Sequence, residues 1–383
     1  MSSPHGLDAL RPVRARIDLD RLRANFDLLR GFVPVPVMPV VKADAYGHGA
    51  DVVARELVGR GATRLAVAYV EEAVALRRAG IRVPIVVLAG FAPTQALALA
   101  EHGLTPVVST PLTLEAAIGI ARAGTPLRAH VKVDTGMSRL GFTPEAFVDA
   151  VQGLTDAGVI VEGVMTHLAA ADESRAFTER QLDLFDDAVA RLHARGIRPE
   201  LVHACNSGGL AFFRRTHTLV RPGLLLYGVR PRPLSPDIAV RPVMTVSADV
   251  ALVKDVPEGT PVSYGGRWVA PRPSRIATIP IGYADGVPRT DRMRESGAFR
   301  IGEGRVPVVG TVCMDLTMAD VTDRPEIVEK AEAILMGDDP DAWDVATWAG
   351  TTSWEALTRV GSRVPRVYVS GGEVVGVWSR FLP

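Results

Sequence analysis

The chain has 383 residues, and its 43 basic and 43 acidic side chains give it a formal net charge of zero. This balance offers no electrostatic reason to expect nucleic acid or an anionic membrane as a partner, so a small-molecule substrate is favoured. The two cysteines exclude a disulfide framework, and the eight histidines lack spacing such as HExxH, so we expect no metal. No segment offers about 18 uninterrupted apolar residues, and the N-terminal stretch lacks a signal-peptide core, which predicts a cytoplasmic protein.

The predicted elements begin with a strand at 14–19 and an amphipathic helix in which Leu22, Phe26 and Leu29 recur at helical spacing. From residue 35 onward, short apolar runs alternate with helical stretches. The expected strands are 35–42, 65–70, 85–88, 106–108, 128–133, 159–166, 201–204 and 218–220. The expected helices start near 50 and near 207 and cover 71–79, 94–101, 112–123, 144–157 and 175–195.

These strand–helix units predict an α/β fold, a (β/α)8 TIM-type barrel over residues 1–230. A doubly wound open sheet is the alternative. Polar clusters follow nearly every predicted strand instead of gathering at one switch point, and this pattern favours the barrel.

A proline-rich stretch at 231–240 predicts a linker between two domains. Beyond it, short strand-like runs separated by Gly, Pro and Asp predict a C-terminal all-β domain over 241–383, either a small barrel or a sandwich. The expected strands are 246–253, 261–264, 275–283, 306–312, 314–321, 333–336, 366–369 and 374–378, with one helix near 353–360.

Lys42 stands at the C-terminal end of the first predicted barrel strand. Chemistry in such barrels sits at this rim, and a lysine there can form an imine with an aldehyde cofactor. The loops after the seventh and eighth strands, CNSGG at 205–209 and RPGL at 221–224, offer a hydroxyl, a guanidinium and glycine-exposed amides to a phosphate group. Each feature alone has a structural alternative, namely a solvated lysine, an N-cap and a turn. Together they indicate pyridoxal phosphate.

Nine strings in chain order resemble the motifs of the alanine racemase family. They are VKADAYGHG at 41–49, HVKVDTGMSRLGF at 130–142, GVMTHL at 163–168, HACNS at 203–207, VRPG at 220–223, VSYG at 262–265, GYADG at 282–286, CMD at 313–315 and RVPRVY at 363–368. The resemblance covers almost the whole chain. It implies a pyridoxal-phosphate enzyme that racemises L-alanine to D-alanine for cell-wall peptidoglycan.

The resemblance also implies a role for each matching residue. Lys42 and Tyr264 correspond to two catalytic bases, one for each face of the substrate Cα, and Lys42 also holds the cofactor. The implied cofactor contacts are Tyr46, Ser207, Gly223 and Leu224 at the phosphate, Arg221 at the pyridine nitrogen and Arg139 at the phenolic oxygen. His167 and Arg221 correspond to the cationic network that must lower the pKa of a tyrosine base, which is about 10 when free. Because arginine cannot accept a proton, Arg221 should leave the ring nitrogen unprotonated and the electron sink weak.

Substrate contacts are implied for Arg139, Met314 and Tyr283, with Asp315 beside them. Lys132 corresponds to a lysine that many family members carbamylate, which would turn a cation into an anion that orients Arg139. Otherwise Lys132 is an inward polar residue that needs a partner. Because Tyr264, Tyr283 and Met314 fall in the second domain, the resemblance implies a head-to-tail homodimer with shared active sites.

One residue departs from the family pattern. Where the family has Tyr before Glu at its phosphate contact, this chain has Trp354 before Glu355. Trp354 retains an N–H donor on a larger ring, so strict preference for alanine is in question and a broader or serine-type racemase is the nearest alternative. A pyridoxal-phosphate decarboxylase should carry other motifs than VSYG and CMD. A non-catalytic cofactor carrier would be a barrel alone.

Overall fold

In the computed structural model the described residues are 11–212, 215–233 and 237–381. The N-terminal stretch in which no signal peptide is predicted begins outside these ranges. The chain divides into two compact units. Unit 1 contains the described parts of Met1–Leu22, Tyr46–His48 and Arg241–Pro383, and unit 2 contains those of Arg23–Ala45 and Gly49–Val240.

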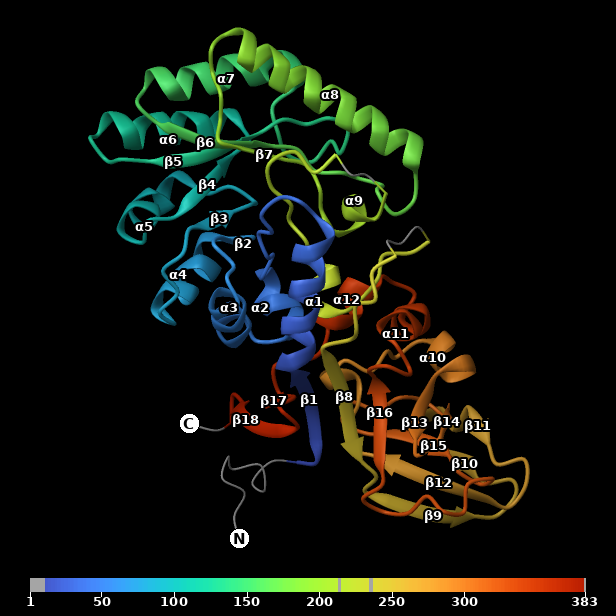
Figure 1. Ribbon diagram of the computed structural model, residues 1–383. Helices are drawn as coiled ribbons and strands as arrows, with labels where there is room; N and C mark the ends of the chain where they lie inside the picture. The colour runs from blue at the N-terminus through green and yellow to red at the C-terminus, as the bar shows by residue number, and fades with distance from the viewer. Residues whose placement is uncertain (1–10, 213–214, 234–236, 382–383) are drawn as a thin grey trace. The chain divides into compact units, whose positions relative to one another are not determined.

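Unit 2 is a (β/α)8 barrel (Figure 1). Its parallel sheet contains, in order, β2 (Leu65–Val67), β3 (Ile85–Val87), β4 (Thr105–Val108), β5 (Arg128–Lys132), β6 (Ile160–Met165) and β7 (Leu201–His203). Two extended stretches close the ring among the described residues. Thr218 bonds to Val202 of β7, while the stretch 36–41 forms parallel bridges to Val220 on one side and to Ala66 on the other. The barrel prediction is therefore confirmed, and the open-sheet alternative is wrong.

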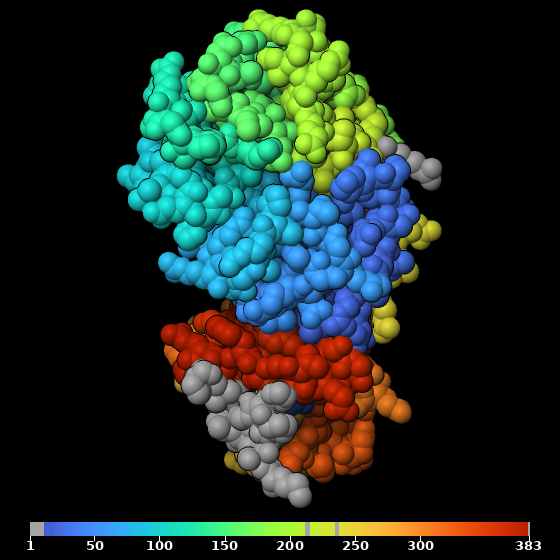
Figure 2. Space-filling model, turned by 60° about the vertical axis from the view of Figure 1, so that its left-hand side comes forward, coloured from blue at the N-terminus to red at the C-terminus, as the bar shows by residue number. Residues whose placement is uncertain are grey.

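Helices on the outside of the barrel follow its strands (Figure 1), and α4 to α7 form much of the unit 2 surface seen in Figure 2. They are α3 (Ala50–Gly59), α4 (Val70–Arg78), η2 (Pro93–Gln95), α5 (Ala96–Glu101), α6 (Pro111–Arg122), α7 (Pro144–Asp156), α8 (Arg175–Ala194), α9 (Ser207–Phe212) and η3 (Leu224–Tyr227). The longest, α8, buries Leu182, Phe185, Val189 and Leu192. This helical spacing packs one apolar face inward. Helix α1 (Leu19–Phe32) begins in unit 1 and continues in unit 2.

Unit 1 is built on one mixed sheet. Its strands, in sheet order, are β18 (Glu373–Trp378), β17 (Arg366–Ser370), β1 (Val13–Asp18), β8 (Met244–Asp249), β16 (Glu332–Met336), β13 (Ala298–Ile301), β14 (Gly304–Val309), β15 (Thr317–Asp320), β12 (Ser274–Ile279) and β9 (Leu252–Val256). A separate hairpin pairs β10 (Pro261–Val262) with β11 (Trp268–Val269). Val256, Val262, Ala270, Ile276 and Val309 form an apolar core cluster.

The C-terminal part is mainly β, as predicted, but three short α-helices occur in its described residues where one was expected. They are α10 (Asp291–Ser296), α11 (Ala342–Ala349) and α12 (Ser353–Thr358), beside the single turns η4 (Tyr264–Gly266) and η5 (Tyr283–Asp285). At α11, the Asp341 carboxylate accepts hydrogen bonds from the backbone N–H groups of Trp343 and Asp344. This N-cap is the local signal that marks the helix.

The first strand differs from the prediction, which placed residues 1–230 in the barrel domain. β1 pairs in parallel with β17 and antiparallel with β8, so it belongs to the sheet of unit 1. Val13, Ala15 and Ile17 are buried along it. The alternating pattern of a strand shows which face is buried but does not identify its partner strands.

Every helix in the described ranges is too short or too polar to cross a bilayer. In the same residues, no cluster of three or more His, Cys, Asp or Glu side chains is suited to hold a metal ion.

Candidate active site

Lys42 starts a helical turn of unusual hand. In α2 (Lys42–Gly47), the residues from Ala43 to Tyr46 have φ angles between 52° and 54°, and Gly47 has 79°, so the turn is left-handed. An L-residue pays about 1–2 kcal/mol for this conformation. Contacts around the turn must therefore stabilise it, and Lys42 leaves the barrel strand on a rigid, strained segment.

Glu72 of α4 is one such contact and is not among the residues predicted from the sequence. Its Oε1 accepts a hydrogen bond from the Ala43 N–H at 2.6 Å, and its Oε2 accepts from Ala68 and Tyr69 at 2.7 and 3.1 Å. Asp44 accepts from the Ala50 N–H at 2.7 Å. A glutamate three residues after a helix N-cap is the sequence signal for part of this arrangement.

Four cationic side chains and one imidazole of unit 2 influence one another at the barrel mouth. Burial lowers the pKa of Lys42, and the charge of Arg139 lowers it further. Burial, followed by the charges of Arg139 and Arg221, lowers the pKa of Lys132 to about 8. Burial and then Arg221 and Lys132 hold the pKa of His167 well below its ordinary value, so this ring is neutral. Such a concentration of positive charge favours an anionic ligand.

The loop that carries Arg139 is folded around Asp134. The Asp134 carboxylate accepts hydrogen bonds from the backbone N–H groups of 136–138 at 2.9, 2.9 and 3.1 Å. The loop then returns to the strand, where the Phe142 N–H donates to the Lys132 carbonyl at 2.9 Å. At Gly141, a Cβ would lie 2.6 Å from the Asp134 nitrogen, so only glycine fits this close approach.

Ser207 and the predicted phosphate-loop amides come together. The Ser207 Oγ accepts hydrogen bonds from the N–H groups of Gly223 at 3.0 Å and Leu225 at 3.3 Å. Its own hydroxyl proton therefore remains to be donated. Leu224 lies between these two amides in sequence and is the first residue of η3. These groups form a set of neutral donors suited to a phosphate.

Arg221 is buried and held on several sides. One terminal nitrogen donates to the His203 carbonyl at 2.9 Å and lies 2.7 Å from His203 Nδ1. The other donates to the carbonyls of Thr166 and Ala204 at 2.9 and 3.1 Å and lies 3.5 Å from His167 Nδ1. Burial lowers the pKa of Arg221 to about 10, which still leaves a cation at neutral pH. The guanidinium is thus fixed in orientation, and the role of His203 was not predicted.

Tyr264 lies in unit 1 at the start of η4 and is 68% exposed. It lines a cavity of about 310 Å³ together with Arg267, Arg289 and Thr311. Thr311 Oγ1 donates to the Tyr264 carbonyl at 3.0 Å, and Ser263, which has a φ of 65°, donates its hydroxyl to the Thr311 carbonyl at 2.6 Å. The backbone around the tyrosine is therefore anchored while its ring is open to solvent.

The predicted substrate residues Tyr283 and Met314 are adjacent in unit 1. The Tyr283 N–H donates to the Cys313 carbonyl at 3.0 Å, and the Ala284 N–H donates to the Met314 carbonyl at 3.1 Å. At Gly282 a Cβ would lie 2.3 Å from the Met314 oxygen, so glycine permits this contact.

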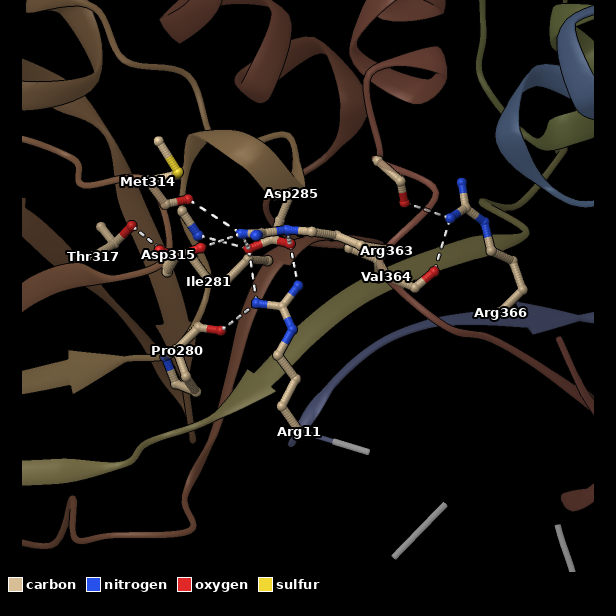
Figure 3. Close-up of polar contacts among 12 residues, drawn as sticks. Arg11, Pro280, Ile281, Asp285, Met314, Asp315, Thr317, Arg363, Val364 and Arg366 are labelled. Atoms are coloured by element: carbon tan, nitrogen blue, oxygen red, sulfur yellow. Dashed lines mark hydrogen bonds and ion pairs between the residues drawn. The ribbon is translucent and has the colours of Figure 1, made fainter. Parts of the chain in front are cut away.

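Asp285 fixes these two segments, as Figure 3 shows. Its carboxylate is fully buried, with ion pairs to Arg11 and Arg363 and a hydrogen bond from the Gly282 N–H at 3.0 Å. Arg363 also donates to Asp315 at 2.6 Å and to the Met314 carbonyl at 3.3 Å. Asp285, Arg11 and Arg363 were not predicted, although DG at 285–286 and RVPR at 363–366 lie in the quoted motifs.

Tyr46 and Trp354, the remaining predicted cofactor contacts, both belong to unit 1. Burial raises the pKa of the Tyr46 hydroxyl to about 12, so it stays a protonated donor. Trp354 on α12 packs edge-on against Trp343, with ring centroids 6.2 Å apart. Arg366, another residue that was not predicted, donates to the Gly47 carbonyl at 2.9 Å and stabilises the end of the left-handed turn.

Comparisons with known proteins agree on one family. The family model described as alanine racemase, N-terminal domain, matches residues 17–231, and the one described as alanine racemase, C-terminal domain, matches residues 243–368. The alanine racemase of Halothermothrix orenii is 40% identical over 94% of this chain and 97% of its own length. That of Desulforamulus reducens is 41% identical over 94% of this chain and 99% of its own.

Solved structures give the same result. The alanine racemase structure from Clostridium difficile has a TM-score of 0.92 at 32% identity and covers 97% of this chain and 99% of its own. The one from Streptomyces coelicolor has a TM-score of 0.89 at 40% identity, covering 95% and 99%.

Proposed function

Because the chain belongs to the alanine racemase family, we propose that it racemises alanine with pyridoxal phosphate and with two bases, Lys42 and Tyr264. Its product, D-alanine, would serve cell-wall peptidoglycan in the cytoplasm. The observation that carries this proposal is the cationic barrel mouth, where Lys42, with a lowered pKa, faces the charge of Arg139.

The residues at the mouth fit this cofactor. The four clustered cations match its phosphate and phenolic oxygens, and Ser207 keeps a hydroxyl proton to donate. A lowered pKa increases the fraction of Lys42 that is uncharged and able to attack the aldehyde carbon. When bound, the cofactor withdraws electrons from the substrate Cα and so makes its proton removable.

Racemisation needs a proton acceptor on each face of Cα. We assign one face to Lys42 Nζ and the other to the phenolic oxygen of Tyr264. The tyrosine is 68% exposed on its own unit, which supports a role at the barrel of a second copy. A head-to-tail homodimer with shared sites follows from this assignment.

Arg221 is proposed to face the cofactor's pyridine nitrogen. Its fixed guanidinium can donate a hydrogen bond there but, as a cation, cannot accept a proton from it. The ring nitrogen would therefore stay unprotonated, and the weakened electron sink would favour return of the proton to Cα over side reactions.

Arg139, Met314 and Tyr283 are proposed to bind the substrate, with Arg139 oriented by a carbamate on Lys132. The pKa of Lys132, about 8, leaves a neutral amine fraction near neutral pH. That amine can attack CO₂, forming an N–C bond and releasing one proton, and the resulting anion would replace repulsion of Arg139 by attraction.

A racemase that also accepts serine is the second candidate. Trp354 favours it, because this larger ring replaces the family's tyrosine and packs on Trp343. The ratio of kcat/KM for alanine and serine distinguishes the two.

The test is to reduce the purified protein with borohydride and map the cofactor mass by peptide analysis. We expect attachment at Lys42 Nζ and no attachment in Lys42→Ala. Attachment at another lysine, or full racemisation by Lys42→Ala, would contradict the proposal.

A further inference from the structure

A buried row of polar side chains crosses the barrel interior from its mouth to its opposite end. Arg221 lies 2.7 Å from His203 Nδ1, and His203 Nε2 lies 2.8 Å from His130 Nδ1. His130 Nε2 faces Glu162 Oε2 at 3.5 Å, and Glu162 Oε1 accepts from Arg64 at 2.8 Å. Arg64 directly precedes β2, at the end of the barrel away from Lys42.

The interior is shaped for this row. His130 and His203 are fully buried, and Glu162 is nearly so. Gly163, the neighbour of Glu162 on β6, clears the space for the His130 ring, since a Cβ there would lie 2.8 Å from its Nδ1 and Cε1. His130 Nε2 and Glu162 Oε2 have no closer hydrogen-bond partner among the described residues, so each is the other's only counterpart there.

The charged ends set the proton positions between them. Arg221 can only donate, so His203 Nδ1 must accept and the His203 proton must lie on Nε2. That proton points to His130 Nδ1, which must accept in turn, so the His130 proton lies on Nε2 and points to the Glu162 carboxylate. Both rings are neutral, because burial lowers the pKa of His130 and holds the pKa of His203 well below its ordinary value.

We propose that Glu162 is a positioning residue for the reaction, which through His130 and His203 keeps an acceptor in front of Arg221 and so holds the guanidinium in its working orientation. This inference rests on the proposed function, in which Arg221 faces the cofactor. If the proton of His130 moved to Nδ1, His203 would have to carry its proton on Nδ1, against the Arg221 donor. Contacts with His130 and Arg64 lower the pKa of Glu162 to about 2, so the carboxylate is a constant anchor.

Glu162→Gln tests the row with little change of shape. An amide has one acceptor oxygen and one donor NH₂, so it cannot accept from both Arg64 and His130. Glu200→Gln is the matched control, since Glu200 lies 3.8 Å from Arg64, is 71% exposed and has no contact with the histidines. Glu162→Asp keeps the charge and serves as the conservative variant.

The primary readout is the tautomer of His130 and His203, measured by ¹⁵N NMR of histidine-labelled protein without substrate. Signals are assigned by their loss in His130→Gln and His203→Gln. We expect Nε2–H for both rings in the wild type and in Glu200→Gln, and Nδ1–H or an exchanging mixture in Glu162→Gln. In the holoenzyme, kcat should fall about tenfold or more in Glu162→Gln, with a shifted pH profile, a nearly unchanged KM and partial recovery in Glu162→Asp.

Unchanged tautomers in Glu162→Gln, or a kcat equal to that of Glu200→Gln, would overturn the inference. Should Glu162→Gln fail to fold, Gly163→Ala replaces it: displacement of the His130 ring must then produce the same tautomer change and loss of kcat, and normal values of both would refute the role. Failure of the proposed function is seen separately, as a wild-type protein that binds no cofactor or does not racemise alanine.

Discussion

Replacing the buried carboxylate of Asp285 should loosen the support of the Tyr283 and Met314 segments. Asp285→Asn keeps the size of the side chain but removes the charge that pairs with Arg11 and Arg363. The amide also offers one acceptor oxygen where the carboxylate bonds to two guanidinium groups and the Gly282 N–H. Two buried donors would then lack a charged partner.

The magnitude follows from the exposure of the partners. Removing one member of a buried ion pair costs about 3–5 kcal/mol. The Arg11 and Arg363 side chains are 32% and 28% exposed, so water compensates part of this loss. We expect the free energy of unfolding to fall by about 2–3 kcal/mol. For a protein unit of this size that corresponds to a decrease in Tm of about 4–12 °C.

The assay is urea denaturation followed by circular dichroism, with Tm from calorimetry. Asp323→Asn is the control, because Asp323 is 78% exposed and pairs with Arg272 at 2.5 Å on the same unit. This surface pair should contribute about 0–1 kcal/mol. Equal stability of the two variants would refute the reasoning, as would an unchanged KM for alanine in Asp285→Asn.

The pH dependence gives an independent check. Burial alone would raise the pKa of Asp285, but the bonds from Arg11, Arg363 and Gly282 outweigh it, and the net pKa is lowered. A carboxyl with a lowered folded pKa contributes stability above its unfolded pKa, about 3.9, and this contribution is lost as pH falls through the folded value. The wild type and Asp285→Asn should therefore differ most above about pH 4 and converge in acid.

Three further outcomes are expected. Glu72→Gln leaves at least one backbone N–H of the left-handed turn without its charged acceptor, which should cost about 1–3 kcal/mol of unfolding free energy and weaken cofactor binding in a titration; an unchanged dissociation constant would contradict this. Wild-type protein in ¹³C-bicarbonate should show a carbamate NMR signal that Lys132→Gln lacks, and identical spectra would exclude the carbamate. Trp354→Tyr should raise the kcat/KM ratio of alanine to serine, whereas a constant ratio would remove Trp354 from substrate selection.

The sequence predicts the barrel well because its strands, buried on both sides, appear as short apolar runs that alternate regularly with amphipathic helices. Lys42 is recognisable for the same reason, since it is the first polar residue after such a run. The left-handed turn that follows is not predictable from propensity, because alanine, aspartate and tyrosine rarely adopt positive φ.

Residues that act through distant partners also escape sequence reasoning. His130, Glu162 and His203 lie on three different strands, and only closure of the barrel brings them into one row. Asp285 and Arg363 lie within recognisable motifs, but their pairing depends on how two loops of unit 1 meet. The partners of β1 are likewise fixed by the sheet and not by the strand's own residues.

The two-base assignment is tested most directly by Cα hydrogen exchange in Tyr264→Phe. The variant is incubated in D₂O with L-alanine or with D-alanine, and deuterium incorporation is measured separately from racemisation. We expect racemisation to be lost and the cofactor to remain bound, while only one enantiomer still exchanges its Cα hydrogen through Lys42. Exchange of both enantiomers at wild-type rates would show that the phenol of Tyr264 is not the second base.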